Sequence, residues 1–346
     1  MSTKLDIAHL SDTGRSYSIN CDRTVAIGPE GLHGGADAFL LVADGMGANR
    51  KGDTASRLTA EKLPELFVQE LAALQKPLSD EDVLAALRKA AQATNELVWR
   101  TSQETPDLKG MGTTVVAAVV RGSTILGCHA GDSRAYLLTN GELVQLTADH
   151  SMIQEVVGAP DPNLVLEARF GTVITRGIGL GRTLDADTIK ATLGSKDALL
   201  LCTDGLSNLV PDETIAATIA EAPDAATACE RLIEKANEAG GLDNIGVVVC
   251  RGGEFEPYTI APSATPVKNA VPTSSQRSSS RRRSRKANGL YVILLVLSVL
   301  LNLALAAVTW WAMSEKGRVE KENATIKKQF LDYVERAERR KRPGGM

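Results

Sequence analysis

The chain has 346 residues, a hydrophobic content of 43%, which is enough to build a sizeable core, and a formal net charge of −3. The charge is unevenly distributed, because residues 268–346 carry 17 Lys and Arg against 6 Asp and Glu, and residues 1–267 are strongly acidic. An acidic body of this size binds nucleic acid poorly, so nucleic acid is not an expected partner. The five cysteines are scattered and form no CxxC pair, so they indicate neither a disulfide framework nor a zinc site.

The first strongly patterned segment is residues 39–45, FLLVADG, an apolar run that ends in Asp44 and a glycine. Such a run predicts a buried strand that delivers one carboxylate into a turn. Two helices are expected next, over residues 53–75 and 79–103, because apolar residues recur there every three or four positions. A capping-box-like start at Ser79 supports the second helix.

Three later strand-like runs also carry a carboxylate at one end. Residues 125–134 contain Asp132 and residues 198–205 contain Asp204, each after an apolar run, whereas Asp243 precedes the run of residues 241–250. A further helix is expected over residues 223–239. Strands in consecutive hairpins with segregated helices predict an α+β layered domain and disfavour a doubly wound parallel sheet.

Carboxylates at the ends of several strands can converge at one edge of a sandwich, where cations must neutralise them. Gly45, which follows Asp44, leaves a bare backbone carbonyl as a further oxygen ligand. All-oxygen sites select hard cations such as Mg²⁺ or Mn²⁺, and a pair of such ions is suited to hydrolysis of a phosphoester. A single Asp–Gly pair is more often only a turn, so the combination carries the prediction.

The C-terminal part has a different organisation. We expect a folded domain over residues 1–255 and a disordered Pro- and Ser-rich linker over residues 256–286, which ends in the basic run RSSSRRRSRK. Residues 287–314 contain no charge and exceed the roughly 20 residues that cross a bilayer, so a transmembrane helix is predicted there. The preceding basic run places the N-terminal domain in the cytoplasm. Residues 315–346 are predicted to form a charged helical tail.

Eight stretches resemble, in family order, the motifs of the metal-dependent protein serine/threonine phosphatases of type 2C (PPM) in their compact bacterial form. They are residues 11–22, 42–56, 110–114, 129–138, 146–151, 174–179, 200–210 and 240–249, and they cover nearly all of residues 5–251. The resemblance implies an antiparallel β-sandwich flanked by helices on both outer faces (α-β-β-α), with a metal site at one end. It also places a mobile flap between Ser151 and Thr175.

The resemblance assigns roles to individual residues. Asp44 would bridge two Mn²⁺ or Mg²⁺ ions, and the carbonyl of Gly45 would bind one of them. Asp204 and Asp243 would complete the coordination of one ion, while Asp22 would help to hold the other, directly or through water.

Asp132, together with Asp204, would match a weaker third ion of bacterial members. The implied activity is hydrolysis of phosphoserine and phosphothreonine in proteins by a metal-activated water. The expected enzyme is anchored in the bacterial plasma membrane, where it opposes a membrane-associated Ser/Thr kinase or acts on the substrates of that kinase.

Two positions depart from the family pattern. Tyr17 stands where members usually have an Arg that grips the substrate phosphate, and Cys21 stands where they usually have Glu. On an extended strand Arg15 would point the same way as Tyr17 and could supply the guanidinium, although a solvated surface charge is an equal alternative. The departures leave open a weakly active or inactive signalling module at the membrane. A purely structural membrane protein would not need the carboxylate cluster. His150 is expected to be a structural hydrogen-bonding residue.

Overall fold

The structure, a computed structural model, describes residues 5–32, 34–47, 50–74, 77–151 and 174–260. The chain divides into two compact units, residues 1–264 and 265–346, and all described residues belong to the first. No helix among the described residues has the length and apolar character needed to cross a membrane. The predicted span over residues 287–314, the tail over residues 315–346 and most of the flap segment lie outside the described residues.

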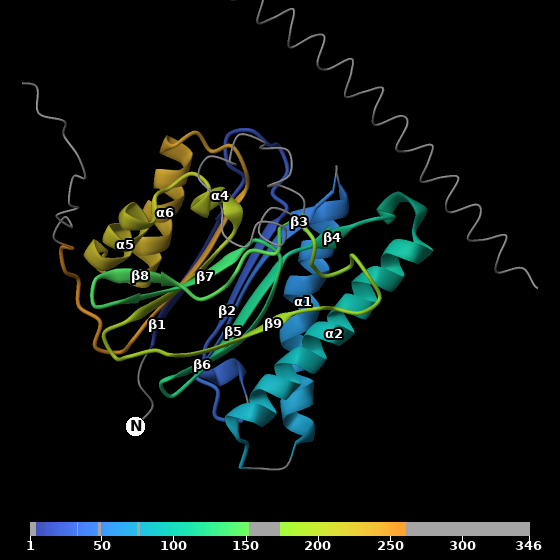
Figure 1. Ribbon diagram of the computed structural model, residues 1–346, viewed down its shortest axis with the longest axis horizontal. Coiled ribbons are helices and arrows are strands. Elements are labelled where there is room, and N and C mark those ends of the chain that lie inside the picture. Colours follow the sequence, from blue (N-terminus) through green and yellow to red (C-terminus); the bar gives the residue numbers. More distant parts are fainter. Residues whose placement is uncertain (1–4, 33, 48–49, 75–76, 152–173, 261–346) are drawn as a thin grey trace, which may run out of the picture. The chain divides into compact units, whose positions relative to one another are not determined.

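Two antiparallel sheets form the centre of this unit (Figure 1). The first sheet has the order β1 (Asp6–Asp12), β11 (Ile245–Arg251), β10 (Ala198–Cys202), β7 (Arg134–Thr139) and β8 (Glu142–Gln145). The second has the order β2 (Asp22–Ile27), β3 (Ala38–Met46), β5 (Val115–Arg121), β6 (Thr124–Ala130) and β9 (Asp187–Thr192), and β4 (Gly112–Thr113) pairs with the end of β3. The predicted α+β antiparallel sandwich is therefore confirmed.

Strand β3 is apolar along nearly its whole length because it is buried on both faces. Leu40 and Val42 pack between the two sheets, whereas Phe39, Leu41 and Ala43 point to the helices on the outer face of the second sheet. Successive side chains of a strand alternate between faces, so a strand covered on both sides needs a continuous apolar run.

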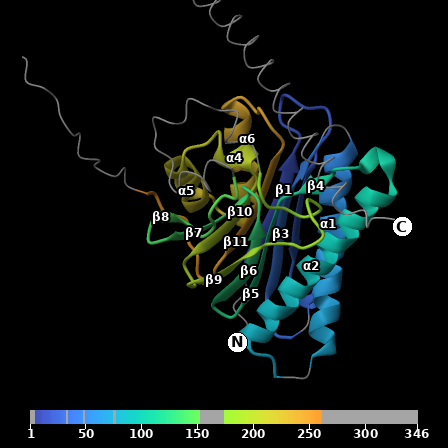
Figure 2. The same cartoon turned by 45° about the vertical axis from the view of Figure 1, so that its right-hand side comes forward.

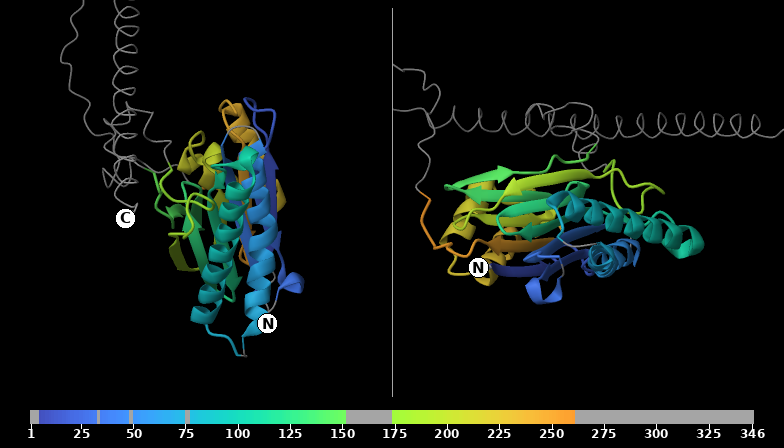
Figure 3. Two further views of the ribbon diagram at one scale, coloured as in Figure 1. Left: turned by 90° about the vertical axis from the view of Figure 1, so that its right-hand side faces the viewer. Right: turned by 90° about the horizontal axis from the view of Figure 1, so that it is seen from below.

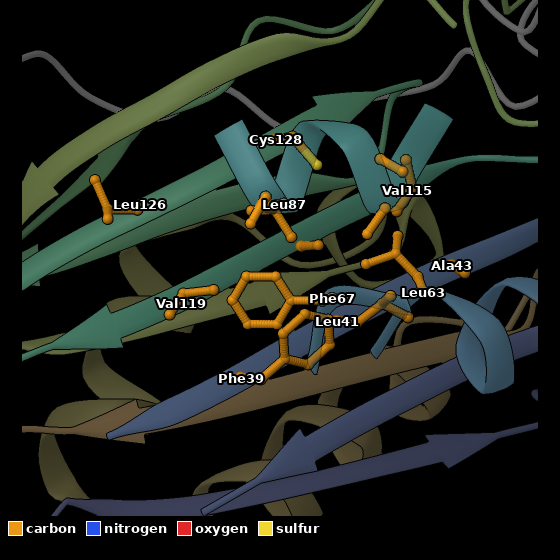
Figure 4. Close-up of a cluster of buried hydrophobic side chains, with 14 of the residues drawn as sticks. Phe39, Leu41, Ala43, Leu63, Phe67, Leu87, Val115, Val119, Leu126 and Cys128 are labelled. Carbon is orange, nitrogen blue, oxygen red and sulfur yellow. The ribbon is translucent and has the colours of Figure 1, made fainter. Parts of the chain in front are cut away.

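Long helices cover that outer face. Helices α1 (Arg50–Ala73) and α2 (Asp80–Glu104) lie side by side over the second sheet (Figures 2 and 3). Phe67 of α1 stacks against Phe39 of β3 with ring centroids 5.5 Å apart, at the centre of the cluster in Figure 4. Ser79 caps α2 through the predicted capping box with Asp82. Short 3-10 turns at Pro29–Gly31 and Pro106–Leu108 complete this half.

The outer face of the first sheet is covered by α4 (Asp204–Ser207), α5 (Asp212–Glu221) and α6 (Ala225–Glu238). Helices on both outer faces are thus confirmed. The fold also continues past the expected domain end at residue 255, because the amide of Tyr258 donates to the carbonyl of Ala220 (2.9 Å) and Ile260 packs against the same core. Residues 256–260, which the sequence analysis assigns to the linker, therefore lie against the folded domain.

Candidate active site

Five carboxylates converge at one end of the sandwich, as the strand ends predict. Asp22 and Asp44 face each other across the β2–β3 pair. Asp132 follows β6, Asp204 begins α4 directly after β10, and Asp243 stands just before β11. Asp44 is central, because each of the other four raises its pKa through electrostatic repulsion.

Four of these five carboxylates line a cleft with a volume of about 700 Å³. Its walls include Asp44, Asp132, Asp204 and Asp243, and the neighbouring Asp149. No Lys or Arg is among the described residues that line it.

Protein partners fix the positions of Asp149 and Asp22. Arg134 binds Asp149 with two nitrogens, Nε at 2.9 Å and Nη2 at 2.7 Å, so the charge of Asp149 is already paired. Asp22 lies behind the wall of the cleft with 2% of its surface exposed, and it accepts a hydrogen bond from the Thr203 hydroxyl (2.7 Å).

Burial and mutual repulsion make the cluster unfavourable as a set of bare anions. Burial raises the pKa of Asp22 to about 8, that of Asp132 to about 7 and that of Asp204 to about 6, and neighbouring carboxylates add to each rise. The pKa of Asp44 is raised well above its usual range, first by burial and then by Asp22. All five can ionise together near neutral pH only if positive charge enters the site.

The donor atoms fit hard divalent cations. Asp132 Oδ1 and Asp204 Oδ1 are buried and have no hydrogen-bond partner, which is costly for a carboxylate oxygen unless a cation takes that place. Gly45 also lines the cleft. Within the described residues, no group of three or more His, Cys, Asp or Glu side chains is arranged to hold a metal ion alone. Ions such as Mg²⁺ keep several waters and use only one or two carboxylates, together with other oxygens.

The structure also shows what keeps Gly45 in place. A Cβ on Gly45 would lie 2.2 Å from the carbonyl oxygen of Gly52 in α1, and a Cβ on Gly52 would lie 2.2 Å from the carbonyl oxygen of Gly45. The two backbones can approach this closely only because both residues are glycine.

Arg15 does not lie where the strand argument put it. Residues 14–16 form a turn, so side chains do not alternate between faces there. The amide of Arg15 donates to the carbonyl of Gly241 (2.7 Å), and its exposed side chain is not among the residues that line the cleft. Tyr17 does line the cleft with 56% of its surface exposed, and Asp243 makes the largest contribution to its raised pKa.

Sequence reasoning missed the side chains that hold these carboxylates. Asn208 Nδ2 donates to Asp204 Oδ2 (3.0 Å) one helical turn away. Asn244 accepts from the amide of Cys21 (2.7 Å) and donates to the carbonyl of Thr13 (2.8 Å), which fastens the rim of the cleft to β11. In the sequence, the one hint of these contacts is that Asn244 stands directly after Asp243.

The raised pKa values predict how pH affects the stability of the metal-free protein. Between the usual carboxyl pKa near 4 and these higher values, the folded protein binds more protons than the unfolded chain, so its free energy of unfolding falls as pH rises. Buried His129, whose pKa is lowered to about 4, acts in the opposite direction below its unfolded value of about 6.5.

Above about pH 6.5 the effect of His129 fades, and the carboxylates dominate until buried cysteines such as Cys128, whose pKa is also raised, begin to contribute toward higher pH. We expect the melting temperature of the chelator-treated chain to fall from about pH 6.5 to about pH 8, and saturating Mn²⁺ to remove this fall. A melting temperature that rises over the same range without metal would contradict the repulsion between the carboxylates.

Comparisons with known proteins agree with this site. Residues 29–239 match the family model of protein phosphatase 2C. The chain is 35% identical over 213 residues to the serine/threonine phosphatase Stp of Listeria welshimeri. This match covers 61% of this chain and 83% of that protein. The solved structure of the Mycobacterium tuberculosis serine/threonine phosphatase PstP matches this structure with a TM-score of 0.61 and a sequence identity of 34%. The match covers 72% of this chain and 98% of that one.

The catalytic domain of PstP has also been solved in complex with two manganese ions, at 34% identity and a TM-score of 0.57, over 71% of this chain and 97% of that one. The family model by itself spans more than half of the chain, in the part that holds most of the converging carboxylates. This protein therefore belongs to the protein phosphatase 2C family and is a serine/threonine protein phosphatase.

Proposed function

We propose that the chain removes phosphate from phosphoserine and phosphothreonine in proteins with the help of two Mn²⁺ or Mg²⁺ ions in the acidic cleft. The observation that carries this proposal is the charge of the cleft wall, which has carboxylates and no Lys or Arg among its described residues. A phosphate dianion would be repelled from such a wall unless divalent cations reversed its charge. The two manganese ions in the PstP structure support the choice of metal.

Asp44 would bridge both ions, and the Gly45 carbonyl would add a ligand to one of them. Asp204 and Asp243 would complete the coordination of one ion, and Asp22 would help to hold the other. When bound, such ions lower the pKa of a water so that it can attack phosphorus, and they neutralise charge on the phosphate.

The residues around these ligands orient them. Thr203 Oγ1 accepts from the amide of Gly246 (2.8 Å) while its own proton goes to Asp22. Because these two hydrogen bonds hold Asp22 in place, its carboxylate need not reorient when a cation arrives, and this favours cation binding. Asp132 has one buried oxygen without a hydrogen-bond partner and lies close enough to Asp204 for that carboxylate to raise its pKa, so Asp132 with Asp204 would hold a weaker third ion.

Counting bound ions tests this proposal. Electron paramagnetic resonance of Mn²⁺ titrated into the full chain should show two tightly bound ions, and Asp243→Asn should weaken at least one of them by about tenfold or more. An absence of bound Mn²⁺ from folded protein would overturn the proposed mechanism.

The substrate phosphate would gain from a contact besides the ions, and Arg15 stays the proposed contact although its exposed side chain is not among the residues that line the cleft. Its exposed guanidinium is expected to contribute as much as a surface ion pair, so Arg15→Ala should raise the KM for a phosphothreonine peptide about threefold and leave kcat unchanged. Arg57→Ala on the exposed side of α1 serves as the matched control. An unchanged KM in Arg15→Ala would leave Tyr17, which lines the cleft, as the neutral contact.

We further propose that residues 287–314 anchor the enzyme in the bacterial plasma membrane with residues 1–255 in the cytoplasm, where it would oppose a membrane-associated Ser/Thr kinase. The support is the uncharged length of this segment and the basic run before it. Protease added to intact spheroplasts should leave the phosphatase domain whole and should digest it after the membrane is permeabilised. Digestion before permeabilisation would reverse the proposed orientation.

A further inference from the structure

Two buried histidines lie behind the turn that carries Asp132. His129 near the end of β6 is 1% exposed and His150 is 4% exposed, and their ring centroids are 4.4 Å apart. Neither lines the cleft. Buried imidazoles next to a proposed metal ligand raise the question of what they hold.

Both histidines bind Gly131, the residue before Asp132. The amide of Gly131 donates to His150 Nδ1 (3.2 Å), and the carbonyl of Gly131 accepts from the amide of His150 (2.8 Å). His129 Nε2 lies 2.9 Å from the same carbonyl. Gly131 has a φ of +124° and its Cβ would lie 2.6 Å from the Thr114 side chain, so this backbone conformation needs glycine and needs to be held.

The partners fix the protonation of both rings. An amide can only donate, so His150 Nδ1 must accept, and the proton of the neutral ring is then on Nε2, which donates to Asp187 Oδ2 (3.2 Å). A carbonyl can only accept, so His129 carries its proton on Nε2. The two ring nitrogens of His150 therefore have different tasks, one toward the turn of Asp132 and one toward β9.

His150 also joins this turn to another part of the cleft wall. Its carbonyl accepts from the amide (2.9 Å) and the hydroxyl (3.1 Å) of Thr175. The next residue along the chain, Ser151, pairs with Ile174 across an antiparallel bridge, and both of them line the cleft. One residue thus connects the Asp132 turn with the walls at Ser151 and Ile174.

We propose that His150 is a positioning residue for metal binding: its Nδ1 holds Gly131 so that the carboxylate of Asp132 faces Asp204 with one oxygen open to a cation. The inference rests on the proposed divalent-cation site and adds to it a residue that would touch neither ion nor substrate. Asp132 Oδ1 and Asp204 Oδ1 are both buried without a hydrogen-bond partner, as expected of ligands held in place in advance. Partners of this kind change metal affinity by about 10- to 100-fold when removed.

Two substitutions separate the tasks of the two ring nitrogens. His150→Asn keeps an oxygen acceptor at the place of Nδ1 and loses the donor to Asp187. His150→Gln keeps a nitrogen donor near the place of Nε2 and loses the acceptor for Gly131. His9→Asn, at an exposed histidine that contacts Thr24, is the matched control.

Mn²⁺ binding to the full chain, measured by electron paramagnetic resonance, gives a readout that does not depend on turnover. The ion that Asp132→Asn weakens identifies the Asp132-dependent ion. We expect His150→Gln to weaken that ion by about tenfold or more and His150→Asn to stay within about threefold of wild type. Circular dichroism and melting temperatures confirm that each variant is folded.

The double variant Asp132→Asn/His150→Gln decides between positioning and general stabilisation. If His150 acts through Asp132, the double variant binds Mn²⁺ no more weakly than Asp132→Asn alone. Losses that multiply, or equal losses in His150→Asn and His150→Gln, would overturn the proposal. If wild-type protein binds no Mn²⁺, the proposed metal site itself is wrong. If His150→Gln binds Mn²⁺ as tightly as wild type, only the proposed role of His150 is wrong.

Discussion

Asp44→Asn is expected to lower kcat/KM for a phosphothreonine peptide by about 10³-fold, which corresponds to about 4 kcal/mol of transition-state stabilisation. Asp44 lies at the centre of the carboxylates, and the other four all act on its pKa. An amide at this position cannot bring a negative charge to two cations at once. The initial rate at saturating Mn²⁺ measures the effect.

The same substitution should have the opposite effect on stability. In the metal-free protein it removes a buried carboxyl that repels its neighbours, so the melting temperature should rise by a few degrees. Asp107→Asn, at an exposed carboxylate in the turn of residues 106–108, should change neither quantity. Turnover in Asp44→Asn close to that of wild type would mean that Asp44 does not bridge the ions.

Gly52→Ala should destabilise the domain by about 3 kcal/mol, although alanine in place of glycine normally favours a helix by about 1 kcal/mol. The added Cβ would lie 2.2 Å from the carbonyl oxygen of Gly45, and no flexible side chain is there to move away. Helix α1 must therefore shift from β3, and Gly45 must shift within the cleft. We expect the turnover at fixed Mn²⁺ to fall as well, by about tenfold or more.

Thermal unfolding followed by circular dichroism measures this loss. Gly181→Ala is the matched control, because a Cβ there would meet only the Thr183 carbonyl at 3.7 Å, and its effect should stay within about 0.5 kcal/mol. A Gly52→Ala variant as stable as wild type would contradict the close approach of the two backbones.

The elements that sequence periodicity predicted are those whose burial is uniform along their length. The expected helices at residues 53–75 and 79–103 correspond to α1 and α2, because each keeps one apolar stripe against the second sheet. Strand β3 was recognisable because both of its faces are covered. Helix α5 was not predicted, since its 10 residues offer only a short pattern in which alanines carry much of the apolar face.

The candidate site was predictable in its carboxylates and not in their surroundings. Asp44, Asp132 and Asp204 each come after an apolar run in the sequence, so a sandwich brings them to one end. The contact between Thr203 and Asp22 joins residues 181 positions apart and depends on how the two sheets meet, which no local pattern encodes. The strand argument for Arg15 fails for a local reason, because the strand ends at Asp12 and a turn follows.

The two departures in the first motif are now located. Tyr17 and Cys21 both line the cleft, so they belong to the site and not to its periphery. The resemblance to the family leads one to expect a charged residue at each of these positions, and both residues here are uncharged.

The most direct test of the whole account is hydrolysis of a phosphothreonine peptide by the full chain, first stripped of metal with a chelator and then titrated with Mn²⁺. The account predicts no turnover without divalent cations, turnover that rises and saturates with Mn²⁺, and none of this rise in Asp44→Asn. Turnover that the chelator does not affect, or folded wild-type protein with no turnover at any Mn²⁺ concentration, would contradict it.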